Sequence, residues 1–138
     1  MKFLFLCKAN TISKMAEGFA REILGPEHKV LSAGSGEDCN VHPLAEKVML
    51  EAGVNILNHK PCSIANLPPG FTEAVDYVIA LCGQDFASKN FPRAKILCWP
   101  FANPDILNPD GDSLITFQRL RDLLRVKIKS LKKELDLG

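Results

Sequence analysis

Short apolar runs alternate with longer amphipathic stretches along this chain. Four of the runs predict β-strands: residues 2–7, the stretch HKVLSAGSG from residue 28, residues 75–82 and residues 94–99. The first run has no polar residue between Phe3 and Cys7, which is typical of a strand buried on both faces of a sheet. We therefore expect a sheet that is covered on both sides.

Apolar residues at spacings of three and four predict helices between these strands. The first helix is expected to begin with Ser13 as its N-cap, with Glu17 close behind, and to end at the Gly-Pro pair of residues 25–26. Its apolar stripe consists of Met15, Phe19 and Ile23. A second helix is predicted to open at Pro43 and to end before Gly53.

The last predicted helix is long, and its apolar stripe consists of Phe117, Leu120, Leu124, Ile128, Leu131 and Leu135. Its basic residues, expected in solvent, are Arg121, Arg125, Lys129 and Lys132. Residues 84–90 are short for a helix but long enough for a crossover, and residues 59–70, with three prolines and a glycine, allow at most a short helix. Residues 100–112 are predicted to be a loop.

Strands that alternate with helices predict an α/β domain with a parallel sheet, helices on both faces and right-handed crossovers. In such sheets, ligands bind at the carboxyl ends of the strands. Cys7, Cys82 and Cys98 all end predicted strands. We therefore expect the fold to gather three thiols along one edge of the sheet.

Composition narrows the functional classes. The chain has 138 residues, of which 46% are hydrophobic and 24% are charged, and this composition is typical of one soluble globular domain. Its net charge of +1 lacks the basic excess of a nucleic-acid-binding protein. Its N-terminal apolar run is too short for a secretory signal, and no run of ~18 apolar residues predicts a membrane span. A cytoplasmic location is expected.

Five cysteines at irregular spacings fit neither a disulfide framework nor a CxxC zinc site. Reduced thiols and no cofactor are therefore expected, with a three-thiol metal site at the sheet edge as a minor alternative.

Cys7 differs from the other cysteines because it lies where the first predicted strand ends, just before the first predicted helix. The helix N-terminus favours a thiolate there, and the amides of the loop KANTI can form an anion-binding nest, although a plain core cysteine is the simpler interpretation.

Six stretches occur in an informative order: FLCKAN, MAEGFAREILG, LSAG, NHKPCSI, DYVIALC and FQRLRDLL. Together they resemble the low-molecular-weight protein tyrosine phosphatase superfamily, and more closely its thioredoxin-coupled arsenate reductase branch, over nearly the whole chain. The resemblance implies a single three-layer domain over residues 1–138, with a four-stranded parallel sheet in the order 2-1-3-4 flanked by helices.

In that family the catalytic loop, or P-loop, reads Cys, five residues, Arg, then Ser or Thr. By position, the resemblance implies that Cys7 is the nucleophile that attacks an oxyanion, Asn10 the amide that braces the loop, and Ser13 the hydroxyl that supports the thiolate. The implied oxyanion-binding residues are Lys8, Ala9, Asn10, Thr11, Ile12, Ser13 and Lys14.

The sequence departs from the family at two catalytic positions. No arginine stands between Ile12 and Ser13, as if that residue had been deleted, and a lysine in the loop offers only a point charge in place of a bidentate guanidinium. Asn103 occupies the position of the general-acid aspartate. Asp105 is the candidate replacement, although a capping or turn residue is the simpler interpretation.

The branch also relays oxidation through further thiols. Cys82 matches the first relay position and is expected to form a redox-active disulfide with Cys7, but Lys89 stands where the second relay cysteine belongs. Cys98 could replace that second thiol, although a buried core thiol is the favoured interpretation. Thioredoxin or glutathione is the implied external reductant.

Three functions follow from these observations. The first is an impaired arsenate reductase in arsenic detoxification, which turns arsenate into arsenite. The second is a non-catalytic family member that binds an oxyanion or acts as a thiol-redox module, and the third is a tyrosine phosphatase. The expected partner is arsenate or a phosphate-like oxyanion, with no nucleic acid and no membrane, and the chain is expected to be a monomer.

Overall fold

The computed structural model describes residues 1–7, 11–34, 43–56, 67–68, 70–81, 84–99 and 113–135. Its strands are β1 (Lys2–Cys7), β2 (Lys29–Gly34), β3 (Tyr77–Ala80) and β4 (Lys95–Cys98). Its helices are α1 (Thr11–Leu24), α2 (Pro43–Glu51), α3 (Phe71–Ala74), α4 (Gln84–Asn90) and α6 (Ser113–Glu134). Each of the four predicted strands is present, and residues 84–90 form a short helix. The predicted loop at residues 100–112 lies outside the described residues.

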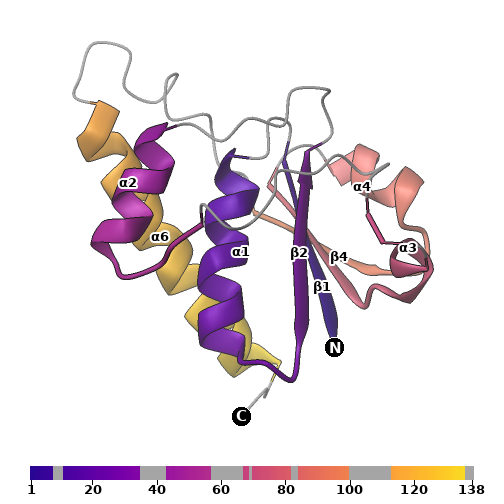
Figure 1. Cartoon of the computed structure of the whole chain (residues 1–138). Helices are drawn as coiled ribbons and strands as arrows, with labels where there is room; N and C mark the ends of the chain where they lie inside the picture. Colours follow the sequence, from indigo (N-terminus) through magenta and orange to yellow (C-terminus); the bar gives the residue numbers. More distant parts are fainter. Residues whose placement is uncertain are drawn as a thin grey trace.

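The four strands form one parallel sheet in the order β2-β1-β3-β4. This confirms the predicted fold class and strand order. Because all the strands run the same way, their carboxyl ends lie along one edge, at the upper end of the sheet in Figure 1. Helix α1 starts at that edge and runs back down beside the sheet (Figure 1).

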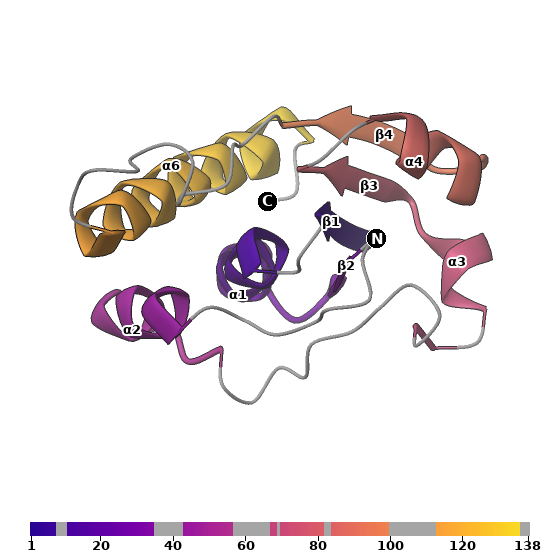
Figure 2. The ribbon, with the colours of Figure 1, turned by 90° about the horizontal axis from the view of Figure 1, so that it is seen from above.

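Helices cover the sheet on both faces, so the domain has three layers. Seen from above in Figure 2, α1, α2 and α6 lie on one side of the sheet, and α3 and α4 lie on the other. The two faces bury separate apolar cores, which we call the α1 core and the α3 core. Leu120, Leu124, Ile128 and Leu131 of α6 are buried in the α1 core, as the apolar stripe predicts.

Strand β1 divides its side chains between the two cores. Phe3, Phe5 and Cys7 belong to the α1 core, whereas Leu4 and Leu6 belong to the α3 core. Every one of these five side chains is buried. The strand is therefore buried on both faces, as its uninterrupted apolar sequence predicts, and the alternation sends the sulfur of Cys7 toward α1.

Helix α1 can pack closely because its middle residue has no side chain. A Cβ built on Gly18 would lie 2.8 Å from Cγ2 of Ile56 and 3.0 Å from Cγ1 of Val54. Both of these residues follow α2 and are buried. Glycine therefore lets the segment after α2 lie directly on α1.

Two expectations about helices need correction. Helix α1 begins at Thr11, so Ser13 lies inside its first turn and is not its N-cap. Arg121 is not a solvated residue, because its Nη1 donates to the carbonyl of Val48 at 3.1 Å and lies 3.3 Å from Oε1 of Glu51. Val48 carries one of the last four carbonyls of α2, which a helix cannot satisfy internally, so Arg121 links α6 to the end of α2.

Among the helices of the described residues, none is long and apolar enough to cross a membrane.

Candidate active site around Cys7

Cys7 is the last residue of β1, at the edge where strand ends and helix starts meet. It pairs in register with Gly34, the last residue of β2, and its side chain is buried in the α1 core. The first turn of α1 follows it in sequence after only three residues. The sulfur thus lies close to the positive end of a 14-residue helix.

Ser13 is the side chain that meets the sulfur. Its Oγ lies 3.1 Å from Sγ of Cys7, within hydrogen-bonding distance, and Ser13 is fully buried. A thiol at this distance donates to the hydroxyl, whereas a thiolate accepts from it, so the contact serves either state of the sulfur. The serine that the family resemblance assigns to the thiolate therefore does reach the cysteine.

The neighbouring positions of the predicted oxyanion loop are described in part. Thr11 and Ile12 lie in the first turn of α1, and the side chain of Ile12 is buried in the α1 core. Lys14 is also buried, and its ammonium lies 3.3 Å from Oε1 of Glu17. The structure thus places the charge of Lys14 against a carboxylate of α1.

Arg21 does not replace the missing arginine at this end of the helix. Its Nε lies 3.0 Å from Oε2 of Glu17, and its side chain is 46% exposed. The sequence holds no other arginine between Cys7 and Arg21. The guanidinium nearest to Cys7 in the sequence is therefore engaged with Glu17.

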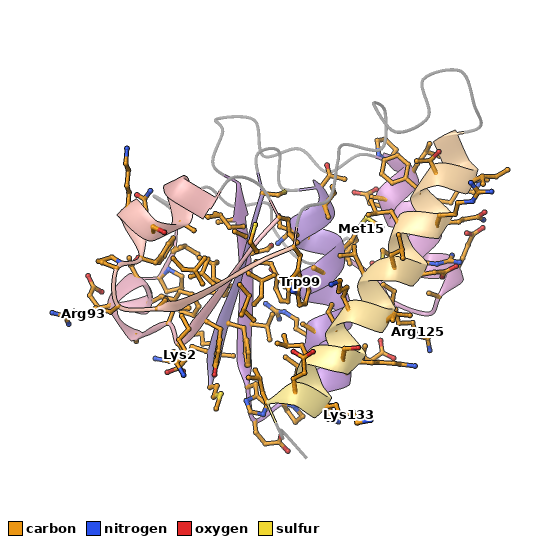
Figure 3. The ribbon with its side chains drawn as sticks, turned by 180° about the vertical axis from the view of Figure 1, so that it is seen from behind. Lys2, Met15, Arg93, Trp99, Arg125 and Lys133 are labelled. Carbon is orange, nitrogen blue, oxygen red and sulfur yellow. The ribbon has the colours of Figure 1, made fainter. Side chains whose placement is uncertain are left out.

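Cys98 corrects an expectation. It ends β4 at the same edge of the sheet, but it is exposed and is not a buried core thiol. Because Ile96 packs on the α3 core and Leu97 on the α1 core, alternation directs Cys98 to the α3 side, whereas Cys7 faces α1. Trp99, which follows, lies between the sheet and α6 (Figure 3). Cys7 and Cys98 thus share an edge but not a face.

Several predicted site residues lie outside the described part of the chain. They are Lys8, Ala9, Asn10, Cys82 and Asp105, together with Asn103. Their roles therefore stay predictions. Within the residues that the structure does describe, no group of three histidines, cysteines or acidic residues is arranged to hold a metal ion.

The structure adds two residues that the sequence interpretation did not assign to the site. Ser32 of β2 donates from Oγ to Oε1 of Glu17 at 2.6 Å, and both residues are buried. A signal for Glu17 was available, since it follows Ser13 by four residues and therefore shares its helix face. Ser32 carried a weaker signal, as a hydroxyl within an otherwise apolar strand.

Comparison with known proteins agrees with this geometry. The sequence model described as Low molecular weight phosphotyrosine protein phosphatase matches residues 2–137. Arsenate reductase 2 of Staphylococcus saprophyticus subsp. saprophyticus is 38% identical over 130 residues, which cover 91% of each chain. The Glutaredoxin arsenate reductase of Synechocystis sp. is 33% identical over 131 residues, covering 94% of this chain and 95% of that protein.

Solved structures give the same result. The structure described as an arsenate reductase in the phosphate binding state superposes with a TM-score of 0.78 at 30% sequence identity, covering 96% of this chain and 97% of that one. Fold and sequence therefore indicate the same family. The chain belongs to the low molecular weight phosphotyrosine protein phosphatase family.

Proposed function

We propose that this protein is an arsenate reductase of reduced activity in which Cys7 is the nucleophile and Cys82 the resolving thiol. The observation that carries the proposal is the contact between Sγ of Cys7 and Oγ of Ser13, 3.1 Å apart at the N-terminus of α1. A hydroxyl donor and the positive end of a helix both stabilise a thiolate. The similarity to arsenate reductases over more than nine-tenths of the chain supports arsenate as the substrate.

The proposed reaction has two steps in the protein. The thiolate of Cys7 attacks arsenic(V), and one oxygen of arsenate leaves as water after protonation. Cys82 then loses its proton and attacks the sulfur of Cys7 as a thiolate, the S–As bond breaks with its electron pair going to arsenic, and arsenite takes up the proton and leaves. The disulfide between Cys7 and Cys82 holds the two-electron oxidation until an external dithiol reduces it.

The absent arginine is the reason to expect reduced activity. A guanidinium gives a tetrahedral oxyanion two parallel hydrogen bonds, and the loss of one such preorganised donor typically costs about 10²- to 10³-fold in rate. Arg21 is paired with Glu17 and is not placed to compensate. The identity of the general acid, with Asp105 as the candidate, is part of the same proposal.

The test is an arsenate reduction assay on the purified full chain, run with the thioredoxin system and, separately, with glutathione and glutaredoxin. The name of the Synechocystis relative favours including the second system. We expect slow arsenite release that Cys7→Ser abolishes and Cys82→Ser reduces to at most one turnover. Cys98→Ser is the matched control and should leave the rate unchanged, because Cys98 is on the opposite face of the sheet.

One observation favours the non-catalytic alternative: the first arginine after Cys7 is bound to a carboxylate. Under that alternative, no arsenite is released above the level of the Cys7→Ser variant. Aryl phosphate hydrolysis, measured in parallel, tests the phosphatase alternative, which needs both the arginine and the general acid. Absence of turnover on both substrates would overturn the enzymatic proposal.

A further inference from the structure

Two polar contacts join α1 to the sheet, one above the other. The upper contact is between Cys7 and Ser13, and the lower contact is between Ser32 and Glu17. All four residues are buried.

The spacing of the two contacts matches on both sides. Ser13 and Glu17 are four residues apart, about 6 Å along a helix axis. On the sheet, Ser32 is in register with Phe5, two residues before Cys7, which is about 6.6 Å along a strand. One helical turn therefore corresponds to two strand residues, so the contact of Ser13 with Cys7 and that of Glu17 with Ser32 form at the same placement of the helix.

The lower contact, between Ser32 and Glu17, is the shorter of the two and involves a carboxylate. The 2.6 Å distance from Oγ of Ser32 to Oε1 of Glu17 is typical of a hydroxyl donating to a carboxylate. Lys14 lies 3.3 Å from the same oxygen, with both side chains at most 3% exposed, and Arg21 lies 3.0 Å from the other oxygen. The two cations offset the cost of burying the carboxylate.

Apolar packing alone fixes the height and rotation of a helix on a sheet only loosely, because it is not directional. A short hydrogen bond to a buried carboxylate is directional and is costly to break. We propose that Glu17 is a positioning residue for Cys7: Ser32 anchors it to β2, Lys14 is its internal counter-ion, and together they set the level of Ser13 at the sulfur. This inference rests on the proposed role of Cys7 as a nucleophile.

Two variants test it. Ser32→Ala removes the anchor and keeps the pair between Glu17 and Lys14. The double variant Lys14→Met/Glu17→Gln removes both buried charges at nearly constant volume. It is used instead of Glu17→Gln alone, which would leave a buried ammonium opposite a neutral amide. The control is Arg121→Met/Glu51→Gln, which removes a more exposed ion pair between α6 and α2 by the same kind of substitution.

The readout is the alkylation rate of Cys7 by iodoacetamide at pH 7, followed peptide by peptide by mass spectrometry, with the melting temperature measured in parallel. We expect the Cys7 rate to fall about threefold or more in both test variants, as the loss of one hydrogen bond implies, while the Cys98 rate stays unchanged. The control should lower the melting temperature without changing the Cys7 rate.

Three results would overturn the inference: a Cys7 rate within about twofold of wild type in folded Ser32→Ala, an equal fall in the control variant, or wild-type Cys7 no more reactive than Cys98. A chain that releases no arsenite but whose Cys7 reactivity depends on Ser32 would refute the proposed function and leave the positioning role intact. The two proposals therefore fail in different ways.

Discussion

At the scale of single residues, the hydroxyl of Ser13 is the group through which α1 meets the sulfur of Cys7. Oγ of Ser13 lies 3.1 Å from Sγ of Cys7. The family resemblance implies that the loop between them is one residue shorter than usual. Under the proposed function, the group that the shorter loop lacks is the guanidinium that the family resemblance assigns to oxyanion binding. The loss should therefore affect the rate of reaction with an oxyanion more than the reactivity of the sulfur itself.

Insertion of an arginine between Ile12 and Ser13 should restore the missing donor. We expect arsenate reduction to rise about 100-fold or more, because a bidentate donor is returned to the oxyanion. Insertion of an alanine at the same place is the control, since it restores the loop length alone. Equal rates for the two insertions would show that the arginine is not what limits this protein.

Residue types predicted the contact between Cys7 and Ser13, but not the ion pair beside it. Cys7 and Ser13 stand out because a thiol and a hydroxyl flank the start of a helix and match the family motif. The role of Lys14 at the oxyanion stays a prediction, and the structure shows its ammonium 3.3 Å from Oε1 of Glu17. Sequence alone could not reveal this ion pair, because a lysine side chain can reach several partners, nor the contact of Glu17 with Ser32, which comes from the second strand.

At the scale of elements, α1 determines the geometry of the site because it packs on β1, β2, α2 and α6 at once. Its placement depends on Gly18, where the segment after α2 comes closest. The sequence predicted the apolar stripe of this helix correctly. It did not reveal that Gly18 is a contact point, because a glycine has no side chain to contribute to the pattern.

Replacement of Gly18 by alanine should lower the free energy of unfolding by about 1–2 kcal/mol. Overpacking typically costs 1–3 kcal/mol, and the better helix propensity of alanine returns part of that. The two methyl groups that an added Cβ would meet most closely belong to Val54 and Ile56, whose β-branched side chains adjust poorly. Urea unfolding measures the effect, and an alanine variant as stable as wild type would contradict the contact.

At the scale of the whole molecule, the periodicity of the sequence was sufficient to predict the parallel sheet, the helices on both of its faces and the long terminal helix. The strand order followed from the family resemblance.

Two long-range features were not predicted from the sequence. Arg121 was expected in solvent from its position on the polar face of α6, but the carbonyl of Val48 lies within its reach. Cys98 was expected to be buried, but β4 is an edge strand and leaves it exposed.

Substitution of Arg121 by methionine should therefore destabilise the fold, whereas the same change at Arg125 should not. Methionine keeps much of the apolar stem but cannot donate to Val48, so we expect a loss of about 1–2 kcal/mol in the free energy of unfolding. Arg125 is exposed and its side chain points away from the protein (Figure 3), so its replacement should change stability by less than about 0.5 kcal/mol. Equal effects in thermal unfolding would contradict the proposed link between α6 and α2.

The proposed activity requires that Cys7 is an activated sulfur rather than an ordinary core cysteine. The most direct test is the iodoacetamide alkylation rate of each cysteine at pH 7 in the folded chain, compared between the wild type and Ser13→Ala. We predict that Cys7 reacts about tenfold faster than Cys98 although it is far less exposed, and that Ser13→Ala removes most of this advantage. A buried Cys7 that reacts no faster than Cys98, or that keeps its full rate without the Ser13 hydroxyl, would contradict the account.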